Sequence, residues 1–233
     1  MMVRVSPPER LREIVEAATR VFGRFGYRRT QMAAVASEVG LSAGAIYGYV
    51  ESKEALFHLV FAHGFGVLGD RPPTLPVRTP PFDETLGLLG RGLRQAAATP
   101  CLRAALRNDA PDDIRAELTA VIEERYTMVE RYWPVLAVIE RSAVDLPALE
   151  DLYFERARRG YFRELQAYLE HRAAAGYLWV LPDARVAARL MTEAIVWFAW
   201  HRRQDREGVT YDDDATRRTV IEFVCNALVV PDR

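Results

Sequence analysis

Apolar side chains recur along this chain with the spacing of α-helices nearly throughout. The first series has offsets of 0, 3, 4, 7, 10, 11 and 14 residues, which lie on one face of a helix. Gly26 should end this helix, because glycine adopts the left-handed conformation of a helix cap at little cost. No segment alternates convincingly with the period of two that is typical of a half-buried strand, so the pattern predicts an all-α fold. The apolar positions of the first helix are Leu11, Ile14, Val15, Ala18, Val21, Phe22 and Phe25.

Two short helical segments follow, joined by a tight turn. Thr30 is placed to cap the first of them, and Gly40 should end it. Ser42 should cap the second, which we expect over about residues 43–48. Two short helices joined in this way have the form of a helix-turn-helix, whose second helix enters the major groove of DNA. We place this motif at about residues 31–50.

The second helix of this motif carries small side chains at the positions expected to be exposed, Ala43, Gly44 and Ala45. Glycine costs about 1 kcal/mol relative to alanine inside a helix, so this composition suits a backbone that must approach another surface closely. Base edges and the thymine methyl group are such a surface. Hydroxyl groups suited to phosphate oxygens stand around the segment, on Thr30, Ser42, Tyr47 and Tyr49.

Lys53 is the only lysine among the 31 Lys and Arg residues of the chain. It should lie in the first turn of a further helix, which Ser52 is placed to cap. A positive charge is mildly unfavourable beside the positive end of the helix dipole. Opposite a phosphate it is well placed, because the ammonium and the helix N–H groups attract the same anion. We therefore interpret Lys53 as a phosphate contact.

Beyond this region the chain divides at a proline-rich segment. Residues 70–81 contain five prolines and cannot form a helix or a central strand. We interpret them as the loop between a small N-terminal domain, residues 8–68, and a larger helical domain, residues 82–230. The helical segments expected in the larger domain are 82–98, 101–107, 111–143, 147–175, 182–204 and 212–229.

Four prolines bear on the ends of these segments. Pro111, Pro147 and Pro182 are each expected in a first helical turn, where the missing N–H costs nothing. Pro134 falls inside a segment and is expected to kink or split it.

Residues 10–61 carry an ordered series of motifs within REIVEAATRVFGRFGYRRTQMAAVASEVGLSAGAIYGYVESKEAL. An amphipathic helix ends in F-x-x-x-G-Y, a T-x-x-x-[I/V]-A helix follows, and G-[L/V]-S-x-G-x-[I/L]-Y and S-K-E-x-L close the series. This quarter of the chain resembles the N-terminal domain of the TetR (tetracycline repressor) family of regulators. The resemblance implies backbone contacts with DNA from Thr30, Tyr47, Tyr49 and Lys53, and groove contacts from Gln31, Ser42, Ala43, Gly44 and Ala45.

Three residues depart from the family pattern. Gly48 and Val50 stand where histidine and phenylalanine are common, and Ala45 stands where threonine is common. Fewer polar contacts to bases follow, so the operator sequence cannot be read from the motif. Arg28 and Arg29 either add DNA contacts or form a solvated loop pair.

The last two long helices suggest self-association. The stretch RLMTEAIVWFAWHR is apolar on most of its circumference, and such a helix must be covered on every side. Pairing with a second copy across a two-fold axis would cover it in a four-helix interface, and burial in a single monomer core is the alternative. The resemblance implies a dimer, so we expect a homodimer through about residues 183–204 and 212–229.

Aromatic residues are concentrated in the middle helices, where some can line an apolar pocket. Packing in the core is the alternative for each of them. The resemblance supports a pocket among these helices without identifying its residues, and we expect a small apolar or aromatic inducer. The candidate pocket residues are Tyr126, Trp133, Tyr153, Phe154, Phe162 and Trp197.

Other classes of protein fit poorly. Gly64, Gly66 and Gly69 have the spacing of a dinucleotide-binding loop, but prolines follow where the helix that binds pyrophosphate must begin. We expect no catalytic site, no cofactor and no metal site. The most apolar stretch, Ala194–Trp200, is far shorter than the ~20 residues of a membrane span, and no signal peptide is recognisable, so we expect a cytoplasmic protein.

Charge is consistent with a partner that is a nucleic acid. The net charge is −1, but residues 1–56 hold eight Lys and Arg residues against six Asp and Glu residues. The sequence thus predicts a ligand-responsive transcriptional repressor, not an enzyme, that binds a palindromic double-stranded DNA operator as a dimer. The alternative is a helical ligand-binding or scaffolding protein whose helix-turn-helix no longer binds DNA.

Overall fold

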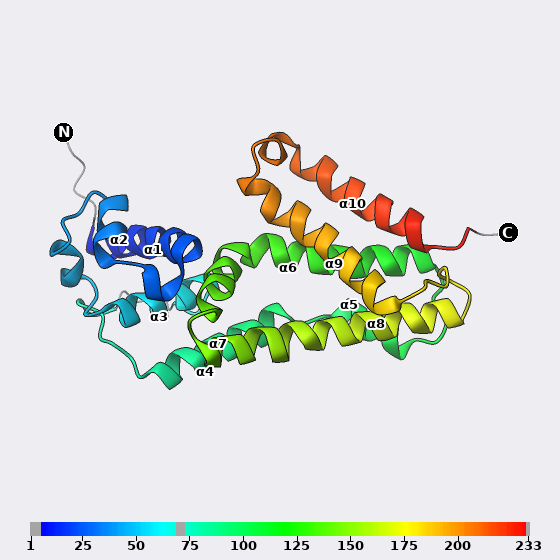
Figure 1. The fold of residues 1–233 in the computed structure, drawn as a ribbon, viewed down its shortest axis with the longest axis horizontal. Helices are drawn as coiled ribbons and strands as arrows, with labels where there is room; N and C mark the ends of the chain where they lie inside the picture. Colours follow the sequence, from blue (N-terminus) through cyan, green and yellow to red (C-terminus); the bar gives the residue numbers. More distant parts are fainter. Residues whose placement is uncertain (1–5, 69–72, 232–233) are drawn as a thin grey trace. The chain divides into compact units, whose positions relative to one another are not determined.

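The structure is a computed structural model that describes residues 6–68 and 73–231. The described residues form helices, turns and two isolated β-bridges, so the predicted all-α fold is confirmed (Figure 1). The first helices are α1 (Pro7–Arg29), α2 (Met32–Glu38), the 3₁₀-helix η1 (Ala45–Gly48) and α3 (Lys53–Gly64). They are followed by α4 (Phe82–Ala96), α5 (Pro100–Arg107), α6 (Ile114–Ala143), α7 (Pro147–Glu150), the π-helical η2 (Asp151–Arg158), α8 (Arg159–Ala174), α9 (Ala184–Ala199), the 3₁₀-helices η3 (His201–Gln204) and η4 (Gly208–Thr210), and α10 (Asp213–Leu228).

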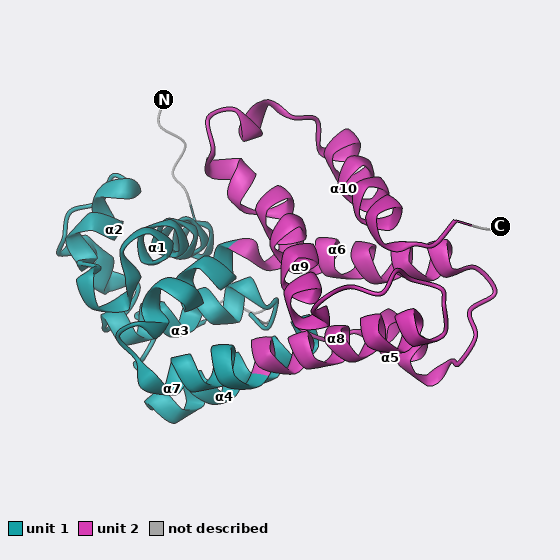
Figure 2. Cartoon of the chain, turned by 45° about the vertical axis from the view of Figure 1, so that its right-hand side comes forward, with its two compact units in different colours: residues 1–96, 134–156 teal, residues 97–133, 157–233 magenta. Residues whose placement is uncertain are grey.

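The chain forms two compact units, each built from two separate stretches of sequence (Figure 2). Unit 1 comprises the chain up to Ala96 together with Pro134–Arg156, and unit 2 comprises the rest. Helix α6 therefore contributes to both, and the boundary falls at Pro134. This proline lies inside α6 without splitting it. The predicted division into domains at residues 8–68 and 82–230 stays a prediction.

The end of α1 differs from the prediction in three details. Gly26 interrupts the helical backbone with a φ of 78°, as predicted, but helical turns resume as far as Arg29. Thr30 does not cap α2. Its hydroxyl donates a hydrogen bond of 2.7 Å to the carbonyl oxygen of Gly26, and Gln31 occupies the N-cap. Phe25 is 43% exposed, because the buried face of α1 extends only to Phe22 before the break.

Of the two serine caps predicted next, that of Ser52 is confirmed, whereas the N-cap position of η1 is Gly44 and not Ser42. The Ser42 hydroxyl accepts a hydrogen bond of 3.2 Å from the N–H of Ala45, although η1 is a 3₁₀-helix and is shorter than the predicted segment. The Ser52 hydroxyl accepts one of 3.0 Å from the N–H of Ala55 and so begins α3. Between them, Gly40 follows the end of α2 with a φ of 67°.

Two of the three predicted proline positions are wrong. Pro147 occupies the first turn of α7, as predicted. Pro111 and Pro182 lie before their helices, because aspartate carboxylates further along satisfy the first free N–H groups. Asp113 accepts from the N–H of Ala116 at the start of α6, and Asp183 caps α9.

In unit 1, the C-terminal part of α6 packs closely against α1 and α3. A Cβ atom on Gly26 would lie 2.7 Å from the carbonyl oxygen of Arg141, and one on Gly64 would lie 2.8 Å from the Cβ of Val135. Such distances allow no side chain at either glycine without displacement of α6. The residues after Pro134 are therefore part of the packing that supports the helix-turn-helix.

The proline-rich loop does more than connect helices. Its described part, residues 73–81, forms no helix, as predicted. Val77 forms a parallel β-bridge with Val50, the residue two positions after η1. Its N–H donates to the carbonyl oxygen of Tyr49 at 2.8 Å, and its carbonyl oxygen accepts from the N–H of Glu51 at 2.9 Å.

In unit 2, α9 and α10 lie side by side (Figure 1). A fully buried arginine, Arg172, stabilises the interior of this unit. Its guanidinium forms an ion pair of 2.7 Å with Glu117 and donates 2.8 Å hydrogen bonds to the carbonyl oxygens of Ala105 and Asn108. These partners compensate the cost of removing the charge from water.

Candidate nucleic-acid interface

The helix-turn-helix presents a surface of small side chains around η1. Ala43, Gly44 and Ala45 are exposed, whereas Ile46 is fully buried and anchors η1 in the core of unit 1. A Cβ atom on Gly44 or on Gly48 would meet no atom within 4 Å. The backbone of this segment is therefore accessible to a partner, as the sequence predicted for a helix that enters a DNA groove.

The predicted polar contacts surround this surface, with one exception. Gln31, Ser42 and Tyr47 are exposed, and Tyr49 is half-buried. Thr30 is buried, and its hydroxyl and its N–H both donate to the carbonyl oxygen of Gly26. The Thr30 hydroxyl is thus not presented to solvent in this structure.

Lys53 is fixed by main-chain oxygens at the junction of α1 and α2. Its Nζ donates hydrogen bonds of 3.2 Å to the carbonyl of Thr30 and 3.4 Å to the carbonyl of Arg28. The ammonium also lies 4.6 Å from the centre of the Tyr27 ring, within the range of a cation–π interaction. These contacts hold the charge in place while leaving the side chain partly exposed.

Tyr27 and Glu54 support Lys53 and were not identified from the sequence. The Tyr27 hydroxyl donates a hydrogen bond of 2.5 Å to Glu54. Burial, and then this hydrogen bond, raise the pKa of Tyr27, so the phenol remains a donor. Accepting the bond lowers the pKa of the Glu54 carboxyl, which therefore remains charged beside the ammonium. The F-x-x-x-G-Y motif near the end of α1, which includes Tyr27, was the sequence signal that could have identified this residue.

Comparison with known proteins identifies this part of the chain. Residues 14–60 match the family described as bacterial regulatory proteins, tetR family. Over 53 residues the chain is 42% identical to YhgD of Bacillus subtilis (strain 168), an uncharacterized HTH-type transcriptional regulator. That match covers 23% of this chain and 28% of YhgD. The N-terminal domain belongs to the TetR family.

Two solved structures share the fold over nearly the whole chain. The ketosteroid transcriptional regulator KstR2 of Mycobacterium tuberculosis is 14% identical, with 99% of this chain and 98% of KstR2 covered and a TM-score of 0.56. The TetR family transcriptional regulator PfmR from Thermus thermophilus is 18% identical, with 91% and 97% covered and a TM-score of 0.51. A helical body following a TetR domain is thus an arrangement known from other proteins.

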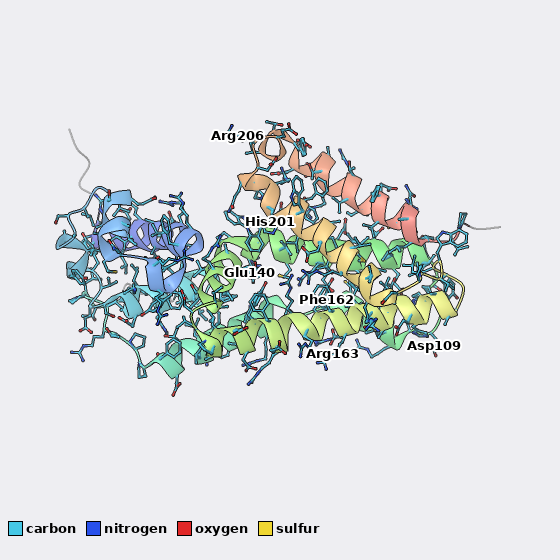
Figure 3. The ribbon with its side chains drawn as sticks, in the orientation of Figure 1. Asp109, Glu140, Phe162, Arg163, His201 and Arg206 are labelled. Carbon is cyan, nitrogen blue, oxygen red and sulfur yellow. The ribbon has the colours of Figure 1, made fainter. Side chains whose placement is uncertain are left out.

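The six candidate pocket residues are distributed over both units. Tyr153 and Phe154 belong to unit 1, where the Tyr153 hydroxyl donates a hydrogen bond of 2.9 Å to Glu140. Figure 3 labels Glu140. Tyr126, Trp133, Phe162 and Trp197 belong to unit 2.

Within unit 2 these aromatic residues differ in their surroundings. Tyr126 is buried and its hydroxyl donates to the carbonyl oxygen of Phe198 at 3.3 Å. Phe162 lies on α8 (Figure 3), with the guanidinium groups of Arg158 and Arg189 5.8 and 5.3 Å from the centre of its ring. Trp197 is 38% exposed. Their role in binding a ligand stays a prediction.

Helices α9 and α10 form open apolar grooves on unit 2. A groove of about 600 Å³ is lined by the end of the preceding loop and by both helices, and a second, of about 560 Å³, continues along them. Leu190 is 68% exposed and Phe223 is 73% exposed along the first groove. None of the six candidate pocket residues lines either groove.

The described residues show few features of other kinds of site. Gly64 ends α3 and Gly66 has a φ of 69°, while Gly69, the third glycine of the spacing, lies outside the described residues. In the described ranges, no three His, Cys, Asp or Glu side chains are grouped as metal ligands. No helix of residues 6–68 and 73–231 is long and apolar enough to span a membrane.

Proposed function

We propose that this chain is a ligand-responsive transcriptional repressor, acting in the cytoplasm, that binds a palindromic operator as a homodimer. The observation that carries the proposal is the exposed run of small residues Ala43–Ala45 at the start of η1, together with Lys53, which main-chain oxygens fix at the start of α3. Such a segment fits a major groove about 12 Å wide, where small side chains let the backbone approach base edges. The membership of the N-terminal domain in the TetR family supports this assignment.

The residues divide into two roles. Gln31 and the segment Ser42–Ala45 face the groove, and Tyr47, Tyr49 and Lys53 contact phosphates, which fix the position of the protein on the duplex without reading sequence. Thr30 contributes through its carbonyl oxygen, which holds Lys53, because its hydroxyl is bonded to Gly26.

A second copy of the chain is the proposed occupant of the α9–α10 grooves. Both helices expose large apolar side chains, and the Phe223 side chain projects beside a groove that its counterpart can fill. A two-fold interface brings the same patch of both copies together, so each copy supplies both the side chain and the groove. One short η1 contacts few base pairs, and two copies about 34–36 Å apart would reach successive turns of the major groove.

Helix α6 is the proposed route by which a ligand acts on the DNA-binding residues. Its residues 114–133 belong to unit 2, and its last residues contact Gly26 of α1 and Gly64 of α3. A small apolar or aromatic ligand among the middle helices would favour a dimer with a different separation of the two η1 segments. The ligand shifts this equilibrium only by its difference in affinity for the two states.

Binding to DNA tests the proposal directly. Purified protein should bind a fragment selected from random DNA, and its affinity should fall with salt. Lys53→Ala should weaken binding to all sequences alike and reduce the slope of log K against log salt by about 0.9 per half-site. Arg91→Ala, which removes an exposed cation on α4, is the matched control and should leave the slope unchanged.

The outcomes separate the proposal from its alternative. A protein that binds no DNA at low salt would be a ligand-binding or scaffolding protein with an inactive helix-turn-helix, and the proposal would be wrong. DNA binding with an unchanged slope in Lys53→Ala would remove Lys53 from the phosphate contacts.

A further inference from the structure

Four hydrogen bonds attach the 73–81 loop to residues 49–52, which join η1 to α3. Two of them form the bridge between Val77 and Val50. In addition, the N–H of Thr79 donates to the carboxylate of Glu51 at 2.9 Å, and the hydroxyls of Thr79 and Ser52 are 2.7 Å apart. The loop is therefore held along the segment that joins η1 to α3.

The bridge determines which side chains of the loop face outward. Residues paired across a parallel bridge direct their side chains to the same side, and successive residues alternate between sides. Val50 is fully buried, so Val77 points toward the core with it. Arg78, the next residue, then points to the opposite side, away from the core. Consistent with this, Arg78 is exposed.

Arg78 carries a charge that no residue in the described ranges pairs. Among the described residues it forms no ion pair, and no hydrogen bond engages its guanidinium. Glu51, whose N–H donates to the carbonyl oxygen of Val77, uses its carboxylate to accept from the N–H of Thr79. Arg78 thus lies between Val77, whose N–H donates to the carbonyl oxygen of Tyr49, a proposed phosphate contact, and Thr79, whose hydroxyl contacts that of Ser52 at the start of α3.

We infer that the 73–81 loop is a second DNA-binding element and that Arg78 binds a backbone phosphate of duplex DNA next to the one bound by Lys53. The inference rests on the proposed function. A guanidinium offers several N–H donors in a planar fork that matches phosphate oxygens. The hydrogen bonds of the loop hold the backbone on either side of Arg78. Little conformational freedom of the backbone is therefore lost when the contact forms.

The test compares five full-length proteins, the unaltered one and four variants that include Lys53→Ala, on one selected DNA fragment and on an unrelated duplex. Binding is measured by fluorescence anisotropy over a range of salt concentrations. Arg78→Ala should weaken binding to both duplexes by about 5- to 30-fold and reduce the salt slope by about 0.9 per half-site. Arg78→Lys should keep most of the slope, because it keeps the charge. Arg91→Ala should behave as the unaltered protein, and thermal unfolding should be unchanged in the Arg78 and Arg91 variants because both side chains are exposed.

Each result has a definite meaning. A loss of affinity and slope in Arg78→Ala, but not in Arg91→Ala, supports the inference. Equal losses in both variants, or none in Arg78→Ala while Lys53→Ala is impaired, overturn the inference and leave the proposed function intact. A protein that binds neither duplex overturns both.

Discussion

The backbone N–H of Tyr27, in α1, donates a hydrogen bond of 3.0 Å to the side-chain hydroxyl of Ser142, in α6. These residues are 115 positions apart in sequence, and Ser142 is fully buried. The bond joins the residue whose ring lies under Lys53 to the last turn of the longest helix. It is thus a direct link between α6 and the proposed DNA contacts.

Ser142→Ala should destabilise the protein, because it leaves the Tyr27 N–H without this acceptor. An unsatisfied buried donor costs about 1–3 kcal/mol, and at this chain length each 1 kcal/mol lowers the melting temperature by about 2–4 °C. Thermal unfolding followed by circular dichroism measures the change. Ser37→Ala, at an exposed position of α2, is the control. A Ser142→Ala protein as stable as this control would show that the bond contributes nothing.

Gly26→Ala should be more destabilising than Gly40→Ala. Both glycines have a positive φ, 78° and 67°, which alanine adopts only with strain. At Gly26 the new Cβ would also lie 2.7 Å from the carbonyl oxygen of Arg141, whereas at Gly40 it would meet no atom within 4 Å.

Urea denaturation of the two variants separates these effects. Gly40→Ala should lose about 1–2 kcal/mol from backbone strain alone. Gly26→Ala should lose a further 1–3 kcal/mol or so from overpacking against α6. Equal losses of unfolding free energy in the two variants would mean that moving α1 away from α6 at Gly26 costs no free energy.

Local signals in the sequence were sufficient for much of the helix-turn-helix. Ser42, Ser52 and Gly40 act on the few residues beside them, so the caps and the turn could be predicted from sequence alone. The burial of Thr30 could not, because its hydroxyl donates back to the carbonyl oxygen of Gly26 in α1 and does not cap α2.

Contacts between residues far apart in the sequence could not be predicted from the sequence pattern. The bridge between Val77 and Val50 involves a single residue pair, and one pair creates no periodicity. The sharing of α6 between the two units was not predicted either. Pro134 was expected to kink or split the helix, but nothing in the pattern placed the residues on its two sides in different units.

The stability of the protein should depend on His58 below pH 6.5. Burial lowers the pKa of this imidazole, whose Nδ1 lies 3.0 Å from the Thr85 hydroxyl, although nearby Glu84 opposes the shift. The folded state therefore favours the neutral ring. The free energy of unfolding has its full value above pH 6.5 and falls as the pH decreases through the lowered pKa of the folded state.

Urea denaturation above and below pH 6.5 measures this dependence. His58→Gln should flatten it, because the amide does not titrate, while His63→Gln, on the exposed side of the same helix, is the control substitution. An identical loss of stability on acidification in His58→Gln and in the unaltered protein would assign the effect to other groups.

Phe223→Asp should dissociate the proposed dimer. The side chain is 73% exposed beside the α9–α10 groove, and a carboxylate buried there in an interface would lack a partner. Because each interface contains two copies, self-association should weaken at least about a hundredfold. Sedimentation velocity measures the change, and loss of operator binding should accompany it.

Val209→Asp is the matched control for this substitution. Val209 is 59% exposed on η4 and lines neither groove, so its replacement should leave the association state unchanged. A Phe223→Asp protein that still sediments as a dimer would place the interface elsewhere.

The division of α6 between the two units also bears on how this protein can be taken apart. A fragment that stops at Ala96 would contain every proposed DNA contact but would lack residues 134–156, against which α1 and α3 pack. Such a fragment would expose to water the surfaces of α1 and α3 at Gly26 and Gly64, which α6 covers in the whole chain. The N-terminal domain therefore cannot be transferred to another protein by itself. Chimaeras should be joined within the helical body rather than at the proline-rich loop.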